Sequence, residues 1–167
     1  MKTMIELIPL TGIQWNGTAV RLSDSRQAVE AVLGRPDFVR ENSLYYFHHD
    51  LRIDFDSAAQ VEFIEFLGGI DGTLQPVIYG VKAFEAGAEE LLRLLEEKNQ
   101  GPIMDNEHGI AYEFPNISVG IFRRRTPEDV KAMLTDGEPW APEDLEEEKK
   151  LAAHWATIGI GKDRYYL

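Results

Sequence analysis

The chain has no cysteine among its 167 residues. Disulfides, thiolate metal sites, cysteine nucleophiles and lipid attachment at cysteine are therefore excluded. It also lacks the run of about 20 apolar residues that a membrane-spanning helix requires. Residues 1–20 contain no basic start followed by an apolar run, so no signal peptide is visible. We expect a cytoplasmic protein that does not bind membranes.

Basic residues are the second shortage, because 17 lysines and arginines face 29 aspartates and glutamates, a net charge of −12. Affinity for nucleic acid depends mainly on neutralising phosphates, so nucleic acid is an unsuitable partner. The stretch from Asp136 to Glu148 has seven acids and no base. The one basic cluster, Arg123–Arg125, is expected to form surface ion pairs with that stretch. A partner for the remaining charge would be a basic protein.

Catalytic motifs are also missing. The sequence has no Gly-x-Ser-x-Gly elbow, no Ser-x-x-Lys, and no phosphate-binding loop followed by lysine. We therefore expect no enzyme, cofactor or metal. One alternative is a metal-dependent hydrolase, since imidazole and carboxylate ligands suit zinc, manganese or iron. Its candidate ligands and catalytic groups are His48, Asp54, Asp56 and Glu62.

What the chain does contain is a helix-then-hairpin pattern that occurs twice. Residues 24–33 favour a helix that stops at Gly34, and an apolar hairpin follows at 44–55. Residues 84–100 favour a second helix, followed by a hairpin at 110–122, with no third strand evident after it. Further strands are predicted at 4–10, 18–22, 60–67 and 74–81, and further helices at 126–134 and 142–157.

This pattern predicts an α+β fold, with the hairpins in antiparallel sheet that is covered on one face by helices. Residues 1–167 would form a single globular domain. Its pseudo-repeat halves would span about residues 1–67 and 74–123, and a helical C-terminal extension would span 124–167.

The first hairpin can be registered from its side chains. If His49 and Asp50 form a two-residue turn, Tyr46 faces Ile53 and Leu44 faces Phe55 on the core side. Pairing Phe55 with Val61 then places Asp54 against Glu62, and Arg52 against Ile64. The outer face predicted as the partner-binding surface consists of Tyr45, Phe47, Arg52, Asp54, Glu62 and Ile64. Aromatic residues and arginine are enriched in interface hot spots. The alternative is that residues 142–167 cover this face.

A family resemblance rests on four short motifs in residues 17–66, with a weaker echo at 78–122. The motifs are Val29-x-x-x-Leu33-Gly34-x-Pro36, Tyr45-Tyr46, Leu51 to Asp56, and Val61-x-x-Ile64. The unit resembles the module shared by the outer-membrane-assembly lipoprotein BamE and the tandem-repeat β-lactamase inhibitors. The resemblance implies a helix layer on a curved antiparallel sheet whose free face binds another protein.

The leading hypothesis is a non-enzymatic intracellular protein that binds another protein. It would be an inhibitor or immunity-type protein acting on a basic toxin. Besides the hydrolase, a scaffold or regulatory domain is the second alternative.

Overall fold

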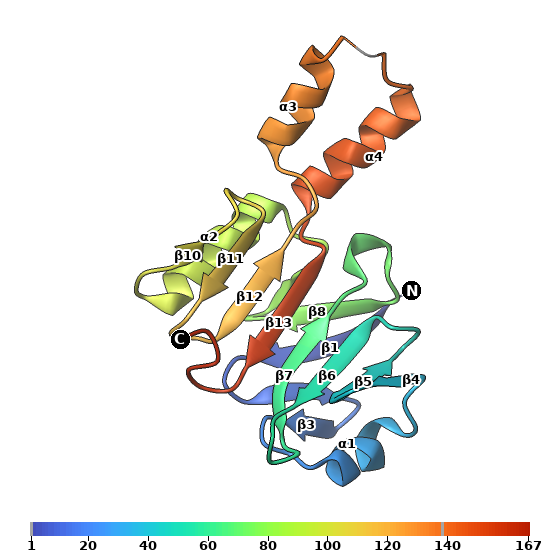
Figure 1. Cartoon of the computed structure of the whole chain (residues 1–167), viewed down its shortest axis with the longest axis vertical. Helices are drawn as coiled ribbons and strands as arrows, with labels where there is room; N and C mark the ends of the chain where they lie inside the picture. The colour runs from blue at the N-terminus through green and yellow to red at the C-terminus, as the bar shows by residue number, and fades with distance from the viewer. Residues whose placement is uncertain (1, 138) are drawn as a thin grey trace.

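The protein has an α+β fold, seen in a computed structural model that describes residues 2–137 and 139–167 (Figure 1). Within these residues, a five-stranded sheet has the order β3-β2-β1-β8-β9. Its strands are β1 (Thr3–Ile8), β2 (Gly12–Trp15), β3 (Thr18–Arg21), β8 (Leu74–Ile78) and β9 (Val81–Lys82). β1 and β8 are parallel, and the other neighbours are antiparallel.

A larger, antiparallel sheet has eight strands in the order β10-β11-β12-β13-β7-β6-β5-β4. Seven of its strands come from residues 38–122: β4 (Phe38–Arg40), β5 (Ser43–Tyr46), β6 (Leu51–Phe55), β7 (Val61–Phe66), β10 (Met104–Asp105), β11 (Ala111–Phe114) and β12 (Val119–Phe122). β13 (Thr157–Gly161) lies between β12 and β7.

The expectation that the second half lacks a third strand is wrong. β13 stands beside β12 as β7 stands beside β6, so the strand order reads alike outward from the β7–β13 pair. The sequence did not indicate this strand as the partner of β12, because two helices separate the two strands in the chain. Thr157 begins this strand and does not end the preceding helix.

Most helix ends lie within two residues of the prediction, but the second helix begins at Ala88 and not at residue 84, and the last ends at Ala153 and not at residue 157. α1 (Arg26–Leu33) starts where the Ser25 hydroxyl accepts the Ala28 N–H at 3.1 Å, and it stops at Gly34, whose φ of 81° suits glycine. The others are α2 (Ala88–Asn99), α3 (Pro127–Thr135), α4 (Pro142–Ala153) and the short 3₁₀ turn η1 (Gly69–Asp71).

A single hydrophobic core joins both sheets to α1 and α2. Ile5 and Leu7 of the small sheet, Ile53 and Phe66 of the large sheet, and Leu91 of α2 belong to the same buried cluster. The cover of the large sheet therefore includes the small sheet as well as helices. This arrangement leaves the opposite face of the large sheet, and the helices beyond β12, outside the core.

The register of the first hairpin differs from the predicted one. Tyr46 pairs with Leu51 and Leu44 with Ile53, because the loop comprises the four residues from Phe47 to Asp50. A shift of two residues leaves every side chain of β5 and β6 on its expected face. The expected facing pairs themselves are wrong.

A β-bulge between Asp54 and Phe55 produces the larger error. Phe55 pairs with Val61 as predicted, but beyond the bulge the partners change. Asp54 faces Phe63, Ile53 faces Ile64, and Arg52 faces Glu65. A bulge inserts one residue on one strand, so the faces of everything beyond it exchange. The predicted opposition of Asp54 to Glu62, and of Arg52 to Ile64, does not occur.

Candidate partner-binding arm

Two residues of the predicted binding face lie elsewhere in the structure. Ile64 is fully buried in the core opposite Ile53, because the bulge turns it inward. Phe47 lies in the hairpin loop with a positive φ of 53°, and its ring packs edge-on against Trp15 at 5.6 Å between centroids. Neither side chain is available to a partner on the outer face.

The remaining residues of that face are on the outer side but are partly covered. Arg52 Nε lies 3.0 Å from Asp54 Oδ1, and its Nη2 lies 3.1 Å from Glu65 Oε1. Glu62 Oε2 lies 3.9 Å from Lys162 Nζ. Tyr45 lies toward the β4 edge, with its ring centroid 5.7 Å from that of Phe38. Aromatic side chains from the segment after β13 also lie over this face.

The cover is made by residues 162–167. The Tyr165 ring stacks on Phe63 at 4.7 Å, and Tyr166 meets the same ring edge-on at 6.3 Å. α4 takes no part, because it projects away from this face (Figure 1). The alternative prediction is that residues 142–167 cover this face. In the structure, residues 162–167 cover it. The face is not open as a flat binding surface.

The candidate metal ligands are spread over different places. Asp56 and Glu62 share Lys162, Asp54 pairs with Arg52, and His48 lies in the hairpin loop, where its backbone N–H donates to Asp37. In residues 2–137 and 139–167, no three histidine or acidic side chains converge as metal ligands would. The hydrolase alternative gains no support from this geometry.

A helical hairpin lies between β12 and β13 in the chain. We call residues 127–153, which contain α3 and α4, the arm. It projects from the end of the large sheet, away from both sheets (Figure 1). None of its described residues, 127–137 and 139–153, belongs to the main core cluster. The arm is thus an addition to a fold that is already closed.

Buried Arg123 fastens the base of the arm. Its side chain, 3% exposed, lies 4.7 Å over the Trp155 ring in a cation–π contact. Its Nε donates to the Gly109 carbonyl at 2.9 Å and its Nη1 to the Ala152 carbonyl at 3.1 Å. Trp155 in turn donates its Nε1–H to the Ala88 carbonyl at 2.8 Å. One arginine therefore joins β12, the end of α4 and the core.

Two ion pairs add to this joint. Arg125 Nε lies 2.9 Å from Glu148 Oε2, and Lys150 Nζ lies 2.6 Å from Asp71 Oδ1. The hydrogen bond to Asp71 raises the pKa of Lys150. The predicted pairing of the arginine cluster with the acidic stretch is thus made by Arg125. Arg123 differs, since it is buried against an aromatic ring.

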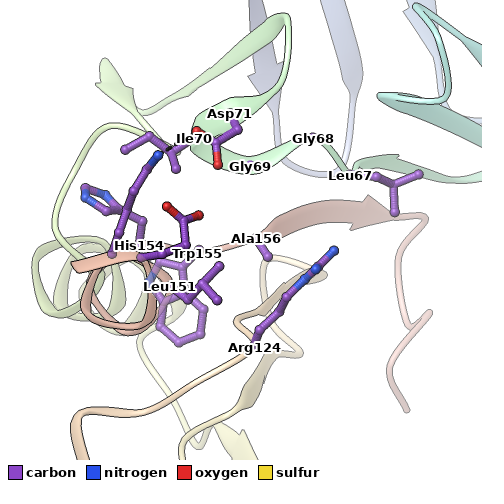
Figure 2. Close-up of a pocket in the computed structure, with 12 residues that line it drawn as sticks. Leu67, Gly68, Gly69, Ile70, Asp71, Arg124, Leu151, His154, Trp155 and Ala156 are labelled. Carbon is purple, nitrogen blue, oxygen red and sulfur yellow. Dashed lines mark hydrogen bonds and ion pairs between the residues drawn. The ribbon is translucent and has the colours of Figure 1, made fainter. Parts of the chain in front are cut away.

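A hollow of about 260 Å³ lies at the base of the arm, between α4 and the Gly68–Asp71 turn. Figure 2 shows Asp71 and Arg124 on opposite sides of it. Lys150 and Glu147 also line it, so charges of both signs meet there. This mixture gives the hollow no electrostatic preference for an anion or a cation. We regard it as the joint between the arm and the body.

The outer surface of the arm is acidic with an apolar end. Its 27 residues hold nine acids and three bases, a net charge of −6 that is half of the charge of the chain. Leu134 is 49% exposed and Trp140 is 37% exposed. Trp140 is oriented by a hydrogen bond from its Nε1–H to the Met133 carbonyl at 3.4 Å. An indole and a leucine are thus presented to solvent beside a strongly negative helix.

Sequence reasoning missed Leu134 and Trp140. The available signal was two large apolar residues flanking Asp136-Gly137-Glu138-Pro139, a turn where a core position is not expected. Glu138 lies outside the described residues.

Comparisons with protein-family models, curated proteins and solved structures found no match. The resemblance to BamE and the β-lactamase inhibitors therefore stays a prediction. Among the described residues, no helix is both long enough and apolar enough to cross a membrane.

Proposed function

We propose that this is a non-enzymatic binding protein whose arm docks onto a basic protein. In its most specific form, the partner is a toxin and the protein is its inhibitor or immunity-type antagonist. The observation that carries the proposal is the exposure of Leu134 and Trp140 on an arm of net charge −6.

The exposed apolar residues and the acidic charge of the arm would contribute to binding in different ways. Tryptophan is the residue most enriched in interface hot spots, and burying Trp140 and Leu134 removes apolar area from water. The acids of α4, among them Glu143, Asp144, Glu146 and Glu147, are exposed and attract a basic surface over a distance. Affinity would come from the apolar end, and fast, salt-sensitive association from the acids.

The test is site-specific photo-crosslinking in the source cells. A benzoylphenylalanine introduced at Trp140 is compared with one at Tyr79, a matched aromatic position that is 39% exposed and directly follows β8. We expect an adduct with a basic protein from position 140 and none from position 79. Equal adducts from both positions, or none from position 140, would contradict the proposal.

The choice between inhibitor and scaffold depends on the partner. A neighbouring gene for a secreted toxin would supply the candidate to purify. We expect the wild-type protein to block that toxin, and Glu143→Lys/Asp144→Lys to block it at least about tenfold less well because steering is reversed. A partner that is bound without loss of its activity would favour the scaffold or regulatory alternative.

A further inference from the structure

The segment 162–167 packs on a part of the outer face of the large sheet that we call the seat. Its floor is built around Phe63, Gly120 and Gly159. Gly120 and Gly159 are partners across β12 and β13, so two neighbouring strands lack side chains at the same level. A Cβ at Gly120 would collide with the Tyr166 hydroxyl, and one at Gly159 with the Phe63 ring. The strands themselves provide the space that the aromatic rings fill.

The rim of the seat is acidic. Asp54 and Glu65 flank Arg52 on its floor, and Asp56 and Glu62 stand at its edge. The segment supplies Lys162, whose Nζ lies 3.2 Å from Asp56 Oδ2. The seat therefore combines an aromatic floor with a place for a cation. Burial raises the pKa of Glu65, in keeping with carboxylates crowded under the rings.

Among the described residues, Lys162 alone of this segment forms backbone hydrogen bonds with the body of the protein. The Lys162 N–H donates to the Glu62 carbonyl, and the Ser118 hydroxyl donates to the Lys162 carbonyl, each at 2.9 Å. The N–H groups of Tyr165 and Leu167 bond within the segment itself, at 3.0 and 3.1 Å. Within the part of the chain that the structure describes, residues 163–167 contact the sheet through aromatic rings and form no backbone ladder with it. Such contacts can be exchanged for those of another chain.

We propose that the seat is a docking groove for a protein segment carrying a basic residue followed by two adjacent aromatic residues. The segment 162–167 fills it as an internal stand-in that such a partner displaces. The proposal does not rest on the arm, which lies on another part of the molecule. A tethered segment competes at an effective concentration on the order of millimolar, so the wild-type protein binds a partner more weakly than its open groove would.

The probe is the labelled peptide Lys-Asp-Arg-Tyr-Tyr-Leu with an amidated end, measured by fluorescence anisotropy. In the full-length variant Tyr165→Ala/Tyr166→Ala the groove is vacated. We expect this variant to bind the peptide at least about tenfold more tightly than wild type does, because the internal competitor is lost. Tyr79→Ala, which removes a tyrosine elsewhere, should bind as wild type does. A peptide with alanine in place of both tyrosines should not bind.

A blocking substitution tests the location. Gly120→Ala, added to the double variant, places a methyl group where the Tyr166 hydroxyl lies and should weaken peptide binding at least about tenfold. Equal binding by wild type and the double variant, or full binding after Gly120→Ala, would overturn the proposal.

A measurement on the otherwise wild-type protein guards against a variant that fails to fold. With 4-fluorophenylalanine at position 166, millimolar peptide should shift the fluorine resonance toward its value in the unfolded chain. An unchanged resonance would overturn the proposal. A dimer that forms as protein concentration rises and that the peptide dissociates would assign the groove to a second copy instead, and overturn the assignment to a different partner.

Discussion

At the residue scale, two adjacent arginines differ sharply in their surroundings. Arg123 is buried against Trp155 with two carbonyl partners, whereas Arg124 is exposed. We expect Arg123→Met to lower the free energy of unfolding by about 2–4 kcal/mol, because it leaves the Gly109 and Ala152 carbonyls unpaired. Arg124→Met is the matched control and should change it by less than about 0.5 kcal/mol. Urea titration followed by circular dichroism measures both, and equal losses would contradict the role of Arg123.

Two carboxylates should give opposite pH trends. Burial raises the pKa of Glu65 above its usual 4.5, so between the unfolded and the folded pKa the folded protein binds more protons at this site than the unfolded chain does. The stability that Glu65 contributes is complete below pH 4.5 and is lost as pH rises through the folded pKa. The stability of wild type relative to Glu65→Gln should therefore fall as pH rises from about 4 to about 7.

Asp56 has the reverse behaviour. The Gln60 N–H, followed by the side chain of Lys162 and the Ala58 N–H, lowers its pKa below 3.8. Its contribution is present above pH 3.8 and is lost as pH falls through the folded pKa. The stability of wild type relative to Asp56→Asn should rise between about pH 3 and about pH 5. Urea titration at each pH measures the free energy of unfolding of both variants. Stability differences that change in the same direction with pH for Glu65→Gln and Asp56→Asn would contradict these assignments.

At the scale of elements, the arm is separable from the core. Phe122 pairs directly with Thr157 where the arm leaves and returns, so β12 and β13 need no helices to stay together. Replacing residues 127–149 with a flexible linker of about eight residues should change the free energy of unfolding by less than about 2 kcal/mol. In an affinity pull-down, which needs no crosslinker at position 140, the same variant should no longer capture the partner that the crosslinking identifies. Loss of cooperative unfolding would show instead that the arm is part of the folding unit.

The single elements were predictable because their signals are local. Ser25 and Gly34 bound α1 through their own hydroxyl and backbone angle, and Thr126 with Asp129 forms a complete capping box for α3. Which strands pair, and in which register, was less predictable. The bulge at Asp54 depends on contacts with β7, and the residue types at that position do not predict a bulge.

At the scale of the whole molecule, both predicted halves and the C-terminal extension contribute to one core and to the large sheet. β7 of the first half pairs with β13 of the extension, Ile64 facing Ile160 and Phe66 facing Ile158. We expect the unfolding transitions measured by circular dichroism and tryptophan fluorescence to coincide. Residues 1–67 expressed alone should show no cooperative transition, because the β7 edge and its buried residues would be exposed. A sigmoidal unfolding curve from that half would contradict a shared core.

The sequence by itself determined the α+β class, most helix boundaries, the uneven charge and the absence of cysteine chemistry. These properties follow from composition and from interactions between residues a few positions apart. Only the tertiary structure decided that β13 completes the large sheet, that Arg123 is an internal anchor, and that residues 162–167 cover the face predicted to bind. Each of these depends on contacts between residues far apart in the chain. Local residue patterns do not specify which distant segment a side chain will contact.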